Sequence, residues 1–491
     1  MRVMPMNTQT NHALMTDLYQ LTMAQGYLKT GLSDLEACFY VHFRENPFQG
    51  GYAVACGLAQ LLDFVEGFAF TDEDCAYLAT ITTPIGEPLF DRDFIESLRS
   101  LELKIDIDGV AEGTVVFPYE PIIRVIGPIA QCQLVETAVL NIINYQTLIA
   151  TKAARICQVA RGPVAEFGLR RAQGPAGGLL ASRAAFVGGC SSTSNVEAGK
   201  VFGLPVSGTH AHSWVMAHPN ELEAFRAFVQ VFPHNAVLLV DTYDTIGGIG
   251  NAIIVAKEME RDGARLTGIR IDSGDLAWLS IKARQLLNEA GLDYVKVVAS
   301  NDLDEHTIQS LHEQDSRIDM WGVGTKLVTA WNQPALSGVY KLSATRKRGE
   351  DRWSPQIKIS DQALKTTLPG LLSARRYFDA EGIYTGDMVY DEQMPPKDGL
   401  IIDSKDELRR KDLTAFDHVE LLEPCIRKGS IVKAPPTVFE AQRNTLASLE
   451  HLHPTNKRLL NPHSYPVGLE QSLFRERDRI VRQARAINTT E

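Results

Sequence analysis

The sequence predicts an α/β protein with an irregular (β/α) barrel domain, an α+β N-terminal domain and a smaller C-terminal extension. The first observation is that short Val- and Ile-rich runs alternate with amphipathic segments of helix length between residues 151 and 345. Strands that alternate with helices form a parallel sheet, and six or more such units are typical of a barrel. The second observation is the length of 491 residues, which is too long for one simple core. We therefore expect domains over residues 1–150, 151–345 and 346–491.

The N-terminal segment mixes helical and strand-like patterns. TDLYQLTMAQGYLKTG (16–31) has helical apolar spacing, whereas ACFYVHF (37–43) and TVVFPYEPIIRVIGP (114–128) resemble strands. A long apolar stretch follows over residues 129–160. Glu136, Asn144, Lys152 and Arg155 interrupt it, which predicts a buried helix rather than a membrane span.

Six apolar runs are the predicted strands of the barrel: VAEFGL (164–169), LPVSGT (204–209), AVLLVDT (236–242), TGIRIDS (267–273), KVVASND (296–302) and IDMWGVGT (318–325). The segments between them, such as LAWLSIKARQLLNEAG (276–291), have the length and apolar spacing of helices. Beyond residue 345 the sequence changes to charged, hairpin-like pieces and a polar helical tail.

The composition excludes several classes of protein. The net charge is −11 at pH 7 and no long Lys/Arg run offsets it, which argues against a nucleic-acid binder. The seven cysteines are scattered and form no C-x-x-C pair, so a reducing cytoplasm is expected. The first fifteen residues lack the apolar core of a signal peptide. We expect a cytoplasmic protein with no nucleic-acid and no membrane partner.

Polar residues gather where the predicted strands end, which is the edge that carries the active site in barrel folds. One interpretation is that Asp, Ser, Thr and Gly at these positions only cap helices and form turns. Capping explains neither the paired arginines nor the paired histidines. The residues at the strand ends are Arg170 and Arg171; His210 and His212; Asp241, Thr242 and Asp244; Asp272, Ser273 and Asp275; Ser300, Asn301 and Asp302; and Gly322, Gly324 and Thr325.

These residue types suit a phosphate and pyrophosphate site. Arginines make bidentate contacts with phosphoryl or carboxylate oxygens. GVGT (322–325) offers backbone N–H groups that can approach a phosphate, although this signal is weak alone. Asp272 and Asp275 suit ribose hydroxyls and a hydrated Mg²⁺, which prefers oxygen ligands.

The H-x-H pair of His210 and His212 has three interpretations. The first is the start of a metal-dependent hydrolase site, but the later strand ends carry no histidine. The second is a neutral imidazole that acts as a nucleophile towards a phosphoryl group, with the other histidine as a neighbour. The third is a pair of loop residues without chemistry.

Several motifs in order along nearly the whole chain match those of one known family. They are TDLYQLTMAQGY, EFGLRRAQGPAGGLLASRAAFVGGCSSTSNVEAGKVFGLPVSGTHAHSWV, LLVDTYDT, IRIDSGDL, VVASNDLDE and GVGTKLVT, and the tail pieces TLPG and NPHSYPVGL. With these motifs the chain resembles the nicotinate phosphoribosyltransferase family. The resemblance implies a type II phosphoribosyltransferase of NAD salvage that condenses nicotinate with 5-phosphoribosyl 1-pyrophosphate. The products are nicotinate mononucleotide and pyrophosphate. The resemblance also implies Mg²⁺, coupling to ATP hydrolysis, and a head-to-tail homodimer.

The family motifs transfer to single positions. His212 matches the histidine that ATP phosphorylates in G-T-x-A-H-S, and His210 falls at a variable position beside it. Tyr19 matches a tyrosine that stacks on the pyridine ring from the partner subunit. The other residues that the resemblance implicates are Phe167 on the opposite face of the ring; Arg170 (or the adjacent Arg171) at substrate anions; Arg270, Asp272 and Asp241 at the base or ribose; and Ser300, Asn301, Gly322, Gly324 and Thr325 at the 5-phosphate. Asp275 is the candidate Mg²⁺ ligand on the chemistry of its carboxylate rather than on the resemblance.

Three alternatives remain open at this point. A nicotinamide-using relative shares the barrel and the histidine but selects an amide over a carboxylate. A catalytically silent barrel would only bind nucleotides or a protein partner. Tyr19 has a structural interpretation as well, because the helical spacing of LYQLTMAQGY also suits a core residue.

Overall fold

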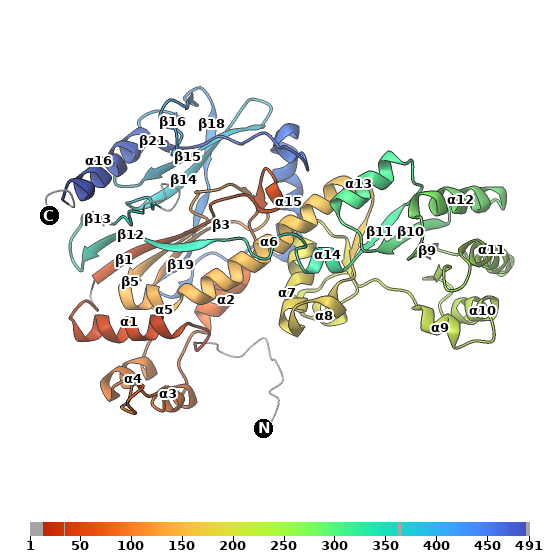
Figure 1. Cartoon of the computed structure of the whole chain (residues 1–491), viewed down its shortest axis with the longest axis horizontal. Coiled ribbons are helices and arrows are strands. Elements are labelled where there is room, and N and C mark those ends of the chain that lie inside the picture. Colours follow the sequence, from red (N-terminus) through yellow and green to blue (C-terminus); the bar gives the residue numbers. More distant parts are fainter. Residues whose placement is uncertain (1–12, 34, 361–365, 488–491) are drawn as a thin grey trace. The chain divides into compact units, whose positions relative to one another are not determined.

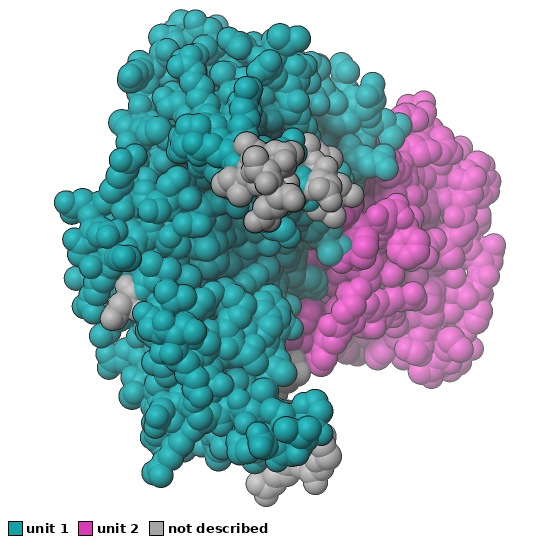
Figure 2. Space-filling model, turned by 60° about the vertical axis from the view of Figure 1, so that its left-hand side comes forward, with its two compact units in different colours: residues 1–148, 335–491 teal, residues 149–334 magenta. Residues whose placement is uncertain are grey.

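The computed structural model describes residues 13–33, 35–360 and 366–487. The chain forms two compact units: residues 1–148 and 335–491 make up unit 1, and residues 149–334 make up unit 2 (Figure 2). Residues 1–12, which include most of the segment that lacks a signal-peptide pattern, lie outside the described residues. Helices and strands occur in both units, which confirms the predicted α/β class.

Unit 2 contains a parallel sheet whose strand order is β7-β6-β11-β10-β9-β8. Its strands are β6 (Val164–Glu166), β7 (Ser192–Thr193), β8 (Val237–Leu239), β9 (Gly268–Ile271), β10 (Lys296–Asn301) and β11 (Met320–Val323). Its helices are α7 (Gly174–Val187), α8 (Val196–Phe202), α9 (His212–Met216), α10 (Glu221–Val231), α11 (Thr245–Arg261), α12 (Leu276–Glu289), α13 (Glu305–Glu313) and α14 (Thr325–Val328). Helices α11 and α12 pack against β9, so the sheet has the helical cover that the strand-helix alternation predicts (Figure 1).

Two details of this sheet differ from the sequence prediction. The run LPVSGT forms no named strand, and only Val206 makes a parallel bridge, to Thr193 of β7. Pro205 has no N–H to give to a ladder, which is one reason why the run pairs so briefly. The short strand β7 itself carries no apolar run and was not predicted. Within the described residues, β7 and β8 are the two edges of the ladder.

Unit 1 contains two larger sheets, of which the first is antiparallel and ordered β13-β12-β1-β5-β3-β19-β20. Its strands are β1 (Leu35–His42), β3 (Asp106–Val110), β5 (Ile123–Pro128), β12 (Val339–Lys347), β13 (Ser354–Pro355), β19 (Leu422–Arg427) and β20 (Ser430–Ile431). The second, ordered β17-β16-β21-β15-β14-β18, comprises β14 (Leu372–Phe378), β15 (Tyr384–Asp391), β16 (Leu400–Ile402), β17 (Arg410–Asp412), β18 (Asp417–Glu420) and β21 (Val467–Glu470). A two-stranded sheet pairs β2 (Ala53–Val54) with β4 (Val115–Val116).

The first sheet joins the two ends of the sequence. Strand β1 pairs with β12, and β3 pairs with β19, so residues before 150 and after 335 share one ladder. Asp108 of β3 forms ion pairs with Arg124 of β5 at 2.8 Å and with Arg427 of β19 at 2.5 Å. The side chain of Asp108 is almost fully buried. This arrangement places most of the predicted N-terminal domain and the predicted C-terminal extension in one unit.

The helices of unit 1 are α1 (Leu18–Lys29), α2 (Leu58–Glu66), α3 (Asp72–Leu78), α4 (Arg92–Arg99), α5 (Ile129–Leu134), α15 (Val438–His451) and α16 (Gln471–Ile487). Helix α6 (Glu136–Ala160) runs through the boundary into unit 2. Its buried cations Lys152 and Arg155 pair with Glu305 of α13 at 2.6 and 3.0 Å. In the described residues no helix is long and apolar enough to cross a membrane.

Candidate active site

The centre of the candidate site is a network at the ends of β9 and β10. Arg270 Nε donates to Ser300 Oγ at 3.0 Å, and the Ser300 hydroxyl donates to Asp272 Oδ1. Arg270 Nη2 lies 3.5 Å from the same Asp272 oxygen. The three residues meet because parallel neighbouring strands end at one edge of the sheet. A cation, a carboxylate and a hydroxyl are thereby fixed within one hydrogen-bonded group.

Asp241, which follows β8, forms hydrogen bonds to the segment that carries Asp272. Its Oδ2 accepts hydrogen bonds from the Asp272 backbone N–H at 2.9 Å and from Ser273 Oγ at 2.6 Å. The other oxygen, Oδ1, is buried and has no hydrogen-bond partner among the described residues. A buried carboxylate oxygen without a partner is costly, so Asp241 has an acceptor available for a ligand.

His212 is the first residue of α9 and lies beside the network. Its Nδ1 is 3.1 Å from Thr242 Oγ1, and its Nε2 is 3.9 Å from Asp272 Oδ2. The His212 side chain is 40% exposed, so a substrate can reach it. One ring nitrogen is therefore anchored by a hydroxyl while the other faces a carboxylate.

His210 has a different environment from His212. It is 8% exposed, its Nε2 accepts a hydrogen bond from the Leu239 N–H at 3.2 Å, and its ring lies 4.8 Å from that of Phe228. Burial lowers the pKa of His210 to about 4. The structure places no group of three or more His, Cys, Asp or Glu that could hold a metal anywhere in the described ranges. The pair is therefore not two solvated loop residues, because His210 is buried.

Phe167 packs closely against two glycines, Gly322 within β11 and Gly324 directly after it. A Cβ atom added to Gly322 would lie 2.7 Å from Phe167 Cδ2, and one added to Gly324 would lie 3.0 Å from the Phe167 carbonyl oxygen. The Phe167 N–H also donates to the Val323 carbonyl at 2.8 Å. A side chain at position 322 would therefore collide with the Phe167 ring unless that ring moved, and one at position 324 would be crowded by the Phe167 backbone.

Glu166 fixes the turn that carries Phe167, and the sequence interpretation missed it. Its buried carboxylate accepts hydrogen bonds from the Gly168 N–H, from Ser182 Oγ at 2.8 Å and from Thr193 Oγ1 at 2.7 Å. The signal that was available is a charged residue at the end of the otherwise apolar run VAEFGL. The turn then leads to η2 (Leu169–Arg171), where Arg170 and Arg171 are both exposed and make no side-chain hydrogen bond or ion pair to a described residue.

The remaining predicted residues serve local structure as well. Asp275 Oδ1 accepts from Trp278 N at 3.0 Å and so caps α12. Asn301 ends β10 with a φ of 139°, which residues other than glycine rarely adopt and which is common at functional sites. Thr325 begins α14 directly after Gly324.

The comparison with known proteins identifies the family. The model "Nicotinate phosphoribosyltransferase (NAPRTase) family" matches residues 163–393, with the N-terminal domain model over 14–144 and the C-terminal domain model over 373–477. A nicotinate phosphoribosyltransferase of Bacillus subtilis is 44% identical over 468 residues, which cover 94% of each chain. The chain belongs to the nicotinate phosphoribosyltransferase family. The chain is thus an enzyme of the glycosyltransferase type.

Relatives from distant organisms support the same assignment. The nicotinate phosphoribosyltransferase of Homo sapiens is 34% identical, and 94% of this chain aligns with 95% of that protein. The crystal structure of human nicotinic acid phosphoribosyltransferase has a TM-score of 0.82 at 31% identity, covering 94% of this chain and 99% of that one. The described two-unit architecture is therefore that of the nicotinate phosphoribosyltransferase family.

Tyr19, the other aromatic residue that the nicotinate phosphoribosyltransferase motifs single out, lies in unit 1. It is in the first turn of α1 and is 50% exposed, so it is not a core residue. Partial burial and the nearby Glu136 carboxylate raise the pKa of the Tyr19 phenol. The buried face of this helix is formed by Gln20, Leu21 and Ala24 instead.

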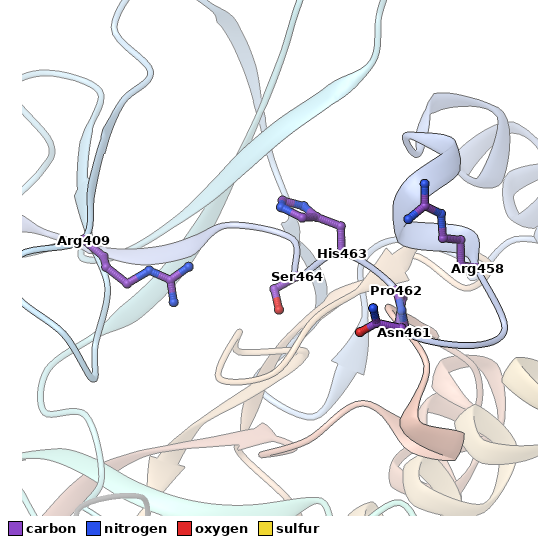
Figure 3. Close-up of a pocket in the computed structure, with 6 residues that line it drawn as sticks. All are labelled: Arg409, Arg458, Asn461, Pro462, His463 and Ser464. Atoms are coloured by element: carbon purple, nitrogen blue, oxygen red, sulfur yellow. The ribbon is translucent and has the colours of Figure 1, made fainter.

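A pocket in unit 1 includes part of the tail piece NPHSYPVGL. It has a volume of about 360 Å³, and Figure 3 shows the residues that line it: Arg409, Arg458, Asn461, Pro462, His463 and Ser464. Arg409 Nη1 lies 3.8 Å from Asp403 Oδ2. None of the strand-end residues of unit 2 lines this pocket.

Proposed function

We propose that this chain condenses nicotinate with 5-phosphoribosyl 1-pyrophosphate to give nicotinate mononucleotide and pyrophosphate. The observation that carries the proposal is the Arg270–Ser300–Asp272 network beside His212, in a chain that aligns with family members over 94% of its length. Pyrophosphate release that depends on nicotinate tests the proposal. A catalytically silent barrel would not need this network intact.

The chain's own residues supply positioning and charge. The pyridine nitrogen forms a bond to C1 of the ribose as the bond from C1 to pyrophosphate breaks, with an oxocarbenium-like centre between them, as in glycoside chemistry. Asp272 places a negative charge near that centre, and Arg270 meets the departing anion. Phe167 and the partner subunit's Tyr19 would stack on opposite faces of the pyridine ring, and Arg170 or Arg171 would pair with the nicotinate carboxylate. The 5-phosphate would rest on Ser300, Asn301, Gly322, Gly324 and Thr325.

Mg²⁺ fits the donors at this edge. It is usually bound through one or two carboxylates together with substrate phosphates, and it would neutralise the leaving pyrophosphate when bound. Asp241, whose buried Oδ1 has no partner among the described residues, and the adjacent Asp272 are the carboxylates best placed to hold it. Asp275, the ligand that the sequence interpretation favoured, already uses Oδ1 to cap α12, so it would act through its second oxygen.

ATP coupling is proposed to proceed through His212. Because Nδ1 faces Thr242, Nε2 is the nitrogen that would attack the γ-phosphorus of ATP. The new N–P bond forms as the bond from the γ-phosphorus to the bridging oxygen breaks, and ADP leaves. We further propose a homodimer with shared active sites and a cytoplasmic location, which rest on the family resemblance and on the scattered cysteines.

Labelling with γ-³²P-ATP tests this role of His212. The wild-type protein is expected to acquire an acid-labile, base-stable label, and His212→Ala is expected to lose it. His210→Gln is the matched control, since it removes the neighbouring imidazole but keeps a hydrogen-bond acceptor, and it should retain the label. A label that survives in His212→Ala and disappears in His210→Gln would show that His210, and not His212, is the nucleophile.

A further inference from the structure

Strand β8 is an edge strand of the parallel sheet of unit 2, paired with another strand on one side only in the described residues. Strand β8 pairs with β9, and the bonds to that side are the Val240 N–H to the Arg270 carbonyl at 3.1 Å and the Gly268 N–H to the Ala236 carbonyl at 3.2 Å. Because backbone groups alternate in direction along a strand, the N–H of Leu239 points away from β9. Leu239 is fully buried, so this N–H needs a partner away from water.

The imidazole of His210 is that partner. Its Nε2 lies 3.2 Å from the Leu239 nitrogen and accepts the hydrogen bond. An imidazole nitrogen accepts only when it carries no proton, so the ring is neutral and its proton is on Nδ1, which lies 3.4 Å from the Ala211 carbonyl. Phe225 and Phe228 pack around the ring, and burial keeps its pKa near 4, which maintains the neutral form at physiological pH.

The residues just before His210 are attached to the opposite edge of the sheet. Thr193 of β7 donates its N–H to the Pro205 carbonyl at 3.0 Å and accepts from the Ser207 N–H at 3.0 Å. The segment 206–210 therefore connects β7 to β8 and completes the ring that the strand ladder alone leaves open. The same segment presents Thr209 Oγ1 to Arg270 Nη1 at 3.2 Å and continues through Ala211 into His212.

We infer that His210 is a positioning residue, whose neutral imidazole closes the barrel at β8 and thereby holds Thr209 against Arg270 and His212 against Asp272. The catalytic consequence rests on the proposed function, whereas the closure does not. All of these contacts lie inside unit 2. Glutamine is the conservative replacement, because its Oε1 can accept the same hydrogen bond, and leucine keeps the apolar packing but has no acceptor.

Hydrogen exchange and turnover of His210→Gln and His210→Leu test the inference. In the Leu variant the amide exchange of the peptide that contains Leu239 should accelerate at least about tenfold, since its hydrogen bond is lost. The kcat for pyrophosphate release should fall by about 10- to 100-fold with a smaller change in KM, because the reacting groups are misplaced by about 1 Å. The Gln variant should recover most of the protection and most of kcat. His234→Leu, which removes an exposed histidine before β8, is the control.

The alternative that His210 only fills space predicts the opposite order. Leucine would then be tolerated and glutamine would be the worse variant, since it would bury an unsatisfied polar group. Slower amide exchange in His210→Leu than in His210→Gln would overturn the closure. Faster exchange in His210→Leu with an unchanged kcat would overturn the positioning role. If the wild-type protein itself released no pyrophosphate, the proposed function would fail while the exchange data still decided the closure.

Discussion

Asp272→Asn is expected to lower the turnover of nicotinate by about 100- to 1000-fold, which is the usual cost of removing a preorganised charge from a transition state. Asp272 Oδ1 accepts from Ser300 and faces Arg270, while Oδ2 faces His212 at 3.9 Å. Asparagine has nearly the same shape but no charge, and its NH₂ would oppose either the guanidinium or the imidazole. The measurement is kcat for pyrophosphate release at saturating nicotinate and phosphoribosyl pyrophosphate.

Asp275→Asn is the matched comparison for this loss. Asp275 caps α12 through Oδ1, and asparagine caps helices almost as well as aspartate, so a much smaller change in kcat is expected. If Asp272 were only a turn residue, both variants would lose about 1 kcal/mol of stability or less and would turn over normally. Normal turnover in Asp272→Asn would therefore remove Asp272 from the catalytic group.

Mixing two inactive variants is expected to restore activity if active sites are shared in a dimer. Tyr19→Ala removes an aromatic ring that is half exposed on α1 of unit 1, and Asp272→Asn disables the network of unit 2. In a mixed dimer with shared sites, one site receives both defects and the other receives neither. After statistical exchange of subunits in such a two-fold dimer, about a quarter of all active sites should carry neither defect.

The controls for this experiment are the two unmixed variants and a mixture kept under conditions that prevent exchange. Tyr19→Phe retains the ring and should have wild-type activity on its own, unlike Tyr19→Ala, because stacking needs the ring rather than the hydroxyl. An exchanged mixture no more active than the average of its parents would show that Tyr19 serves the site of its own chain or none.

The strand ends of unit 2 could be predicted from the sequence because apolar runs and the polar residues after them are local signals. Local signals predict Asp272 and Ser300 at strand ends, whereas Arg270 is indicated by the family resemblance alone, and the structure brings the three into one network. The pairing of β1 with β12 could not be predicted in this way. The paired residues of these two strands lie some 300 positions apart in the sequence, and no local pattern specifies which strands of a long chain pair.

The two histidines illustrate a second limit. Residues two apart in an extended segment face the same side, which made a shared site for His210 and His212 a reasonable hypothesis. The backbone changes at Ala211, which is the N-cap residue of α9, and the two rings then diverge. His210 turns to the β8 edge and His212 turns to Thr242. Glu166 was missed for a related reason, because its three donors come from a turn, a helix and a short strand that only the fold brings together.

The most direct test of the central claim is a comparison of nicotinate with nicotinamide as the substrate for phosphoribosyl pyrophosphate, with Mg²⁺ and ATP present. The exposed Arg170 and Arg171 have no acidic partner among the described residues, and a guanidinium pairs with a carboxylate but not with an amide. The kcat/KM for nicotinate is therefore expected to exceed that for nicotinamide by about 100-fold or more, with nicotinate mononucleotide as the product. An equal or higher kcat/KM for nicotinamide, or no pyrophosphate release with either base, would contradict the account.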